Sequence, residues 1–176
     1  MAAVTEFVPL DLPELSFIRM LDAPRELVFR AWTSAACVAA WWGPHGFSIP
    51  LCEVDPRPGG RFAVHMRGPD GTLYPGGGVF LEIAAPELLA FTSTLTGGNG
   101  RVLIDAVNTV SFEDLGPRTK MTLDARVVSA ARQAAGSLAG MEEGWTQSLE
   151  RLAAIVKAAG AAPRQPPAVP SYARRS

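Results

Sequence analysis

The spacing of apolar and polar residues changes twice along this chain. Residues 15–21, LSFIRML, form a short apolar run that predicts a first strand. In the segment after it the apolar residues have helical spacing, with Asp22 as the expected N-cap. Ser34 interrupts that segment, so we expect two short helices. The second should begin at the Ser34 cap and end before Gly43 and the proline that follows it.

From residue 47 to residue 128 the apolar residues recur at every second position, which is typical of half-buried antiparallel strands. In RFAVHMR, for example, Phe62, Val64 and Met66 share one face. About six strands are expected here, separated by turn sequences. Those turns are GPDG at 68–71, AAPE at 84–87, TGGNG at 96–100 and DLGPR at 114–118.

The last element returns to helical spacing. One stripe contains Met141, Trp145, Leu149, Leu152 and Val156. A curved antiparallel sheet has one apolar face to cover, and this long helix is available to cover it. The sequence therefore predicts an α+β fold, in which a curved antiparallel sheet of about six to seven strands wraps around a long C-terminal helix.

We expect one domain at 15–159, preceded by an N-terminal arm at 1–14 and followed by a Pro/Ala-rich tail at 160–176 that is disordered. The first residues lack the basic segment and apolar run of a signal peptide. No run of about 18 apolar residues occurs, so a membrane span is not expected.

Composition narrows the classes of function. Of 176 residues, 48% are hydrophobic and 19% charged, which is typical of a globular domain. The net charge is −1 and the basic residues are scattered, so nucleic-acid binding is disfavoured. Cys37 and Cys52 are too isolated for a disulfide framework, and reduced thiols favour a cytoplasmic location.

Five segments resemble a known superfamily: APRELVFRAWT with WWGP, DPRPGGRF, MRGPDG, YPGGGVFLEIAAPELLAFT and GMEEGWTQSLERLAAIV. Together they cover nearly all of 15–157 in the order found in the SRPBCC or START-like superfamily, and they are most similar to bacterial homologues of the activator of heat-shock protein 90 ATPase. The resemblance implies the helix-grip fold and an apolar cavity between the sheet and the C-terminal helix.

The candidate ligand-binding residues follow from alternation, from the helical stripe and from the implied cavity. They are Trp41, Trp42, Phe62, Met66, Tyr74, Phe91, Met141, Glu142 and Trp145. Plain core packing is the alternative for each apolar member. Trp41 and Trp42 are about 100° apart on a helix, so one should anchor the helix in the core while the other covers the cavity rim or faces solvent.

Three glycines recur every four residues at 136, 140 and 144, and each costs about 1 kcal/mol relative to alanine in a helix interior. They would open a groove beside Met141 and Trp145. The alternative is that they allow close packing against a strand, or that a helix starts near Ser137.

Motifs for nucleophilic catalysis, for phosphate binding and for metal binding are absent from the sequence, so no catalytic residue, metal or cofactor is predicted. The main hypothesis is binding of a small lipid-like, aromatic or polyketide-like molecule. One alternative is a chaperone-associated or other protein-partner module, and a homodimer also stays open. Another is a cyclase-like or hydrolase-like enzyme using Glu142, Tyr74 and Arg101.

Overall fold

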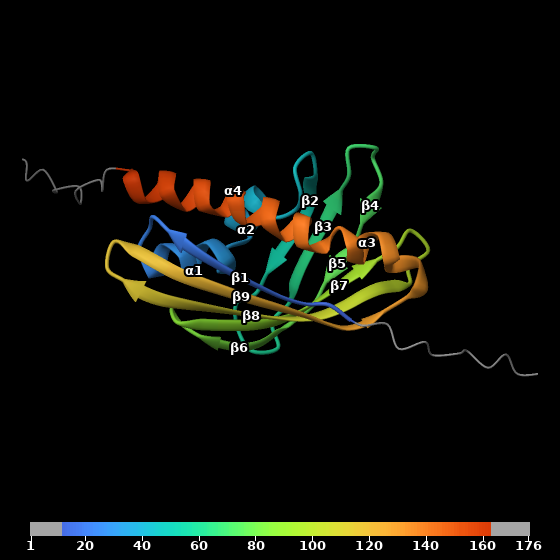
Figure 1. Cartoon of the computed structure of the whole chain (residues 1–176), viewed down its shortest axis with the longest axis horizontal. Coiled ribbons are helices and arrows are strands. Elements are labelled where there is room, and N and C mark those ends of the chain that lie inside the picture. The colour runs from blue at the N-terminus through green and yellow to red at the C-terminus, as the bar shows by residue number, and fades with distance from the viewer. Residues whose placement is uncertain (1–11, 163–176) are drawn as a thin grey trace, which may run out of the picture.

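The computed structural model describes residues 12–162 as an α+β fold (Figure 1). The elements are β1 (Glu14–Leu21), α1 (Arg25–Thr33), α2 (Ala35–Trp41), β2 (Ser48–Val54), β3 (Phe62–Arg67), β4 (Leu73–Tyr74), β5 (Gly76–Gly77), β6 (Phe80–Ala84), β7 (Leu88–Thr96), β8 (Val102–Leu115), β9 (Arg118–Ala130), a 3-10 turn η1 (Arg132–Ala134), α3 (Ala135–Ala139) and α4 (Met141–Ala161).

The elements expected from the sequence are present. Two short helices follow the first strand and meet at Ser34, whose carbonyl accepts the Val38 N–H although its hydroxyl makes no capping bond. The four turn sequences connect the strands where they were expected. Between residues 47 and 128, β4 and β5 have only two residues each, and the other strands have five or more.

The strands form two sheets, which together make one curved surface. The larger has the order β1-β9-β8-β7-β5, with β6 also paired to β7, and the smaller has the order β2-β3-β4. The Phe62 N–H donates to the Gly78 carbonyl at 2.9 Å, and the Thr92 N–H donates to the Val79 carbonyl at 2.9 Å. The segment around Gly78 therefore links β3 to β7.

The glycines at 76 and 78 permit this link. A Cβ on Gly78 would overlap the Thr92 carbonyl oxygen, and a Cβ on Gly76 would overlap the Val64 carbonyl oxygen. Gly77 is different, because its nearest neighbour would be the Thr94 hydroxyl at 3.8 Å. The sequence GGG thus lets two backbones pass closer together than a side chain would allow.

Helix α4 lies along the concave side of the sheet, with α1 and α2 near its C-terminal half and α3 at its start (Figure 1). The predicted stripe faces inward, and Trp145, Leu149, Leu152 and Val156 are all buried. These side chains meet the inner face of β8 and β9 and the apolar sides of α1 and α2. The helix and the sheet therefore share one core.

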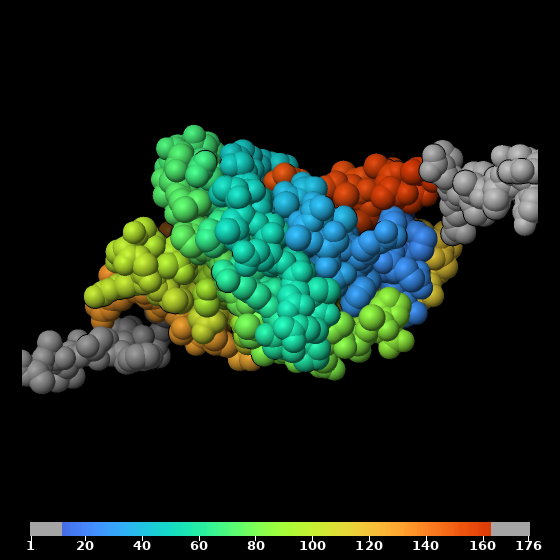
Figure 2. Space-filling model, turned by 180° about the vertical axis from the view of Figure 1, so that it is seen from behind, coloured from blue at the N-terminus to red at the C-terminus, as the bar shows by residue number. Residues whose placement is uncertain are grey.

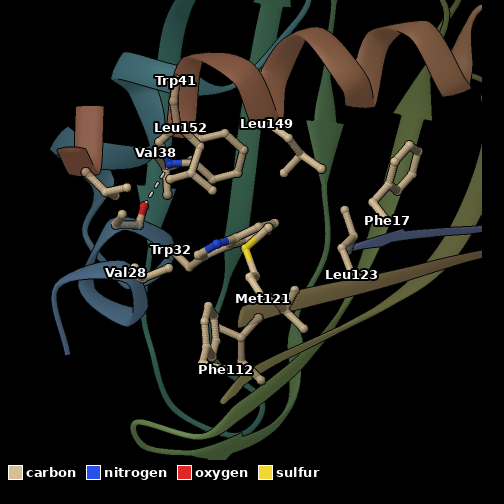
Figure 3. Packing of buried hydrophobic residues seen from close by; sticks show 14 of the residues in the cluster. Phe17, Val28, Trp32, Val38, Trp41, Phe112, Met121, Leu123, Leu149 and Leu152 are labelled. Atoms are coloured by element: carbon tan, nitrogen blue, oxygen red, sulfur yellow. Dashed lines mark hydrogen bonds between the residues drawn. The ribbon is translucent and has the colours of Figure 1, made fainter. Parts of the chain in front are cut away.

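Trp41 belongs to that core (Figure 3). It is fully buried, its indole N–H donates to the Ala31 carbonyl at 2.9 Å, and its ring meets Trp32 edge-on with the ring centroids 4.6 Å apart. In Figure 3 Trp32 also lies next to Met121 of β9. Trp41 is thus the tryptophan that anchors α2.

The predicted arm and tail fall almost entirely outside the described residues. Strand β1 begins at Glu14 and α4 ends at Ala161. Among residues 12–162, no helix is long and apolar enough to cross a membrane.

We predict that Gly78→Ala lowers the free energy of unfolding by about 3 kcal/mol or more, because the new methyl group must displace the β7 backbone. Gly77→Ala is the matched control, and it should change stability by less than about 1 kcal/mol, since its Cβ meets only an ordinary contact. Urea unfolding of both variants measures the difference. Equal midpoints would show that Gly78 does not carry the link between the strands.

Candidate functional site

A cavity of about 460 Å³ lies between the concave face of the sheet and the beginning of α4. Its walls come from three places: strands β3 to β5, β7 and β8; the turn after α2; and the α3–α4 segment. The lining residues are Trp42, Pro44, Phe47, Phe62, Val64, Met66, Tyr74, Gly76, Gly77, Ser93, Thr94, Leu95, Ile104, Ala106, Gly136, Ser137, Gly140, Met141, Gly144 and Trp145.

The three regularly spaced glycines leave this space open. A Cβ on Gly136 would meet no atom within 4 Å, and the nearest atom to a Cβ on Gly140 would be the Gly136 carbonyl oxygen at 3.6 Å. For Gly144 it would be the Pro44 ring at 3.5 Å. Close packing therefore does not require glycine at these positions. All three line the cavity, in agreement with the groove alternative. The helix-start alternative also holds in part, because α3 begins at Ala135 and Gly140 lies at the boundary between α3 and α4.

The aromatic wall of the cavity contains Trp42, Phe62 and Trp145. The Trp42 ring meets Trp145 edge-on, with the ring centroids 5.2 Å apart, and its centroid lies 5.3 Å from that of Phe62. Trp42 is only partly buried, whereas its neighbour Trp41 has no exposed surface. The question that the sequence left open is thus answered: Trp41 anchors the helix and Trp42 faces the cavity.

Side chains of α4 hold the turn that positions Trp42. The Ser148 hydroxyl accepts the Gly43 N–H at 3.1 Å, and the Gln147 side-chain oxygen accepts the His45 N–H at 2.8 Å. Arg151 donates to the carbonyls of Ala40, Trp42 and Gly43 at 3.1 to 3.3 Å. Carbonyls at the end of a helix lack internal partners, so the guanidinium caps α2 from another helix.

Six of the nine predicted residues line the cavity and three do not. Trp41 is in the core, as described above. Phe91 is also fully buried, with its ring centroid 4.5 Å from that of Phe62, so it packs behind the wall. Glu142 is exposed, because one residue after Met141 rotates its side chain about 100° away from the inward stripe. The prediction of Phe91 and Glu142 as lining residues is corrected accordingly, whereas Trp41 is the core anchor that the sequence expected from one of the two tryptophans.

Sequence reasoning missed the wall formed by β7 and β8. Ser93, Leu95, Ile104 and Ala106 line the cavity from these strands. Their alternation was a usable signal, because Leu95, Ser93 and Phe91 occur at every second position of β7, as do Ile104 and Ala106 in β8. Pro44 and Phe47 were not predictable in this way, since they belong to a turn.

The cavity has few groups that could support chemistry. None of its lining residues is acidic, basic or histidine, and the polar side-chain groups of these residues are the hydroxyls of Tyr74, Ser93, Thr94 and Ser137 and the indole N–H groups of Trp42 and Trp145. Arg101 lies in the exposed loop between β7 and β8, outside the cavity. Among residues 12–162, no cluster of histidine, cysteine or acidic side chains could hold a metal ion.

The two cysteines are unpaired and partly buried. Burial raises the pKa of the Cys52 thiol above its ordinary value, and the adjacent Glu53 carboxylate adds to the effect. Cys52 therefore favours the unreactive thiol over the thiolate.

Comparison with known proteins places the chain among related folds. Residues 22–157 match the family described as Activator of Hsp90 ATPase homolog 1-like protein. A solved structure of a Chromobacterium violaceum protein is 26% identical, covers 82% of this chain and 96% of its own, and superposes with a TM-score of 0.72.

Two other solved structures are similar to the chain over most of its length. A protein from Arthrobacter aurescens is 29% identical over 82% of this chain and 86% of its own, with a TM-score of 0.71. The AHSA1 protein of Silicibacter pomeroyi is 26% identical over 84% of this chain and 99% of its own, with a TM-score of 0.70. No curated protein matches the sequence.

We predict that Arg151→Met lowers stability by about 1 to 2 kcal/mol, because three carbonyls at the end of α2 lose a charged donor. Trp42 should also become more accessible, which acrylamide quenching of tryptophan fluorescence measures. Lys157→Met, at an exposed position of the same helix, is the control and should change neither quantity. Equal quenching in both variants would show that Arg151 does not hold the Trp42 turn.

Proposed function

The chain belongs to the Activator of Hsp90 ATPase homolog 1-like family, and from this membership together with the cavity we propose that it binds a small hydrophobic molecule beneath the start of α4. The observation that carries the proposal is the cavity itself, at about 460 Å³. Small-molecule sites are typically concave, mostly apolar and about 300 to 1,000 Å³ in volume.

The composition of the walls supports an aromatic or otherwise irregular apolar ligand. Trp42, Phe62 and Trp145 offer flat surfaces from three elements that are far apart in the sequence. Met66 and Met141 are flexible and polarizable, so they can adapt to the shape of a bound molecule. The hydroxyls of Tyr74, Ser93 and Ser137 are then available to orient it, whereas that of Thr94 already donates to the Gly77 carbonyl.

The two alternatives from the sequence have less support. A partner-binding module acts through its surface and needs no cavity, whereas the apolar cavity is the feature that ligand binding requires. An enzyme of the cyclase or hydrolase kind needs an acid or base near its substrate. Of Glu142, Tyr74 and Arg101, only Tyr74 lines the cavity. A cytoplasmic location, a homodimer and a protein partner remain proposals that do not depend on the cavity.

We predict that N-phenylnaphthylamine, a neutral dye that brightens in apolar surroundings, binds in the cavity and quenches Trp42 and Trp145. Met66→Trp should weaken binding by about tenfold or more, because the larger side chain takes up part of the cavity. Met20→Trp is the matched control at a position that is 45% exposed on β1. Fluorescence titration of both variants and the unmodified protein measures the difference.

Equal affinity in the two variants would place the dye outside the cavity. If neither the dye nor a mixture of lipids and aromatic metabolites binds the unmodified protein, the proposed function is wrong.

A further inference from the structure

One polar pair interrupts the apolar interior beside the cavity. Asn108 of β8 is fully buried, and its side-chain nitrogen donates to the Ser93 hydroxyl oxygen at 2.8 Å. Ser93 lines the cavity, whereas Asn108 lies behind it. The amide therefore acts on the cavity only through Ser93.

The neighbouring backbone fixes which way the amide points. The Asn108 nitrogen lies 3.5 Å from the carbonyl oxygen of Phe91, the residue opposite it in the ladder. A carbonyl oxygen attracts the amide nitrogen and repels the amide oxygen, so Phe91 favours the orientation in which the nitrogen faces Phe91 and Ser93. The Ser93 hydroxyl, at 2.8 Å, is the closer of the two acceptors.

This orientation determines what the Ser93 hydroxyl can offer. Its oxygen accepts from Asn108, and among residues 12–162 its own hydrogen has no hydrogen-bond acceptor. Thr94 differs, since its hydroxyl already donates to the Gly77 carbonyl at 2.9 Å. Tyr74 and Ser137 bring further hydroxyls to the walls, but no described group orients them. Ser93 is thus the hydroxyl held ready as a donor toward the cavity.

The amide oxygen of Asn108 supports this interpretation. It is buried and has no hydrogen-bond partner among the described residues. An unpaired buried acceptor is unfavourable for folding. The buried amide therefore lowers the stability of the fold. The group that it positions is the Ser93 hydroxyl on the cavity wall.

The side chains of the cavity walls also limit the charge of the ligand. No acidic, basic or histidine side chain lines the cavity. An ionised ligand group would lose its hydration there without gaining a charged partner. A neutral oxygen, in contrast, needs only one donor.

We propose that the ligand of this cavity is a neutral, largely aromatic molecule with a hydrogen-bond acceptor, such as a ketone oxygen, that receives the Ser93 hydroxyl. This inference rests on the proposed function and narrows its ligand class. A fatty acid or another ionised amphiphile does not fit it.

Three compounds of similar size separate these requirements: acetylnaphthalene has a neutral acceptor, ethylnaphthalene has none, and naphthoate is an anion. Each competes with N-phenylnaphthylamine for the unmodified protein. Acetylnaphthalene should bind at least about fivefold more tightly than ethylnaphthalene, as expected for one added hydrogen bond. Naphthoate should bind at least about tenfold more weakly than acetylnaphthalene.

Ser93→Ala should remove the preference for acetylnaphthalene while leaving the affinity for ethylnaphthalene nearly unchanged. Ser129→Ala, at an exposed position of β9, is the matched control and should keep the preference. If Ser93→Ala does not fold, Ser93→Cys replaces it, because a thiol has a similar shape and is a much weaker donor.

The outcomes separate the two proposals. If the dye and all three compounds fail to bind, the proposed function is wrong. If the dye binds but the three compounds compete equally, or if Ser93→Ala keeps the preference, the cavity binds ligands and the inference about Ser93 and neutrality is overturned.

Discussion

The packing of α4 against the curved sheet determines both the stability of the domain and the position of its cavity. From Trp145 onward the inward stripe of the helix carries large side chains, and these are buried against the sheet and the two short helices. Before Trp145 the helix and its short neighbour α3 have glycines at every fourth position. One half of the concave surface is thus filled by the helix, and the other half is left as space.

The same helix also builds the far wall of that space. Gln147, Ser148 and Arg151 bind the backbone after α2, and this backbone holds Trp42 against Trp145 and Phe62. The polar side of α4 therefore fixes an apolar surface. Figure 2 shows the two short helices (blue) beside α4 (red), and the β3–β4 turn (green) projecting at the other end of this face. Wall and core are parts of one packing arrangement, so a change in α4 should affect both.

Most of the fold could be predicted because its elements follow from periodicity. The alternation in β3 placed Phe62 and Met66 on the inner face, and the helical stripe placed Met141 and Trp145 there as well. Glu142 was less predictable, because a residue at the edge of a stripe can face either way. Phe91 was assigned to the correct face, but only the structure shows that Phe62 separates it from the cavity.

Other features depend on tertiary contacts that no local pattern contains. The choice between Trp41 and Trp42 depends on the Ala31 carbonyl and on α4, which follows more than 90 residues later in the sequence. Arg151 is an ordinary helix residue in the sequence, and its role as a cap appears only when α2 lies beside it. The Asn108 and Ser93 pair also requires the register of β7 and β8.

The most direct test of the central claim fills the space that the glycines leave. Gly140→Leu adds a side chain at a position where a Cβ has only ordinary contacts, and Ala139→Leu adds the same side chain at an exposed neighbour outside the cavity. Isothermal titration with N-phenylnaphthylamine compares the two variants, and thermal unfolding checks that both are folded. We predict that the dye loses about tenfold or more in affinity for Gly140→Leu and keeps its affinity for Ala139→Leu. Unchanged affinity in a folded Gly140→Leu variant would contradict the account.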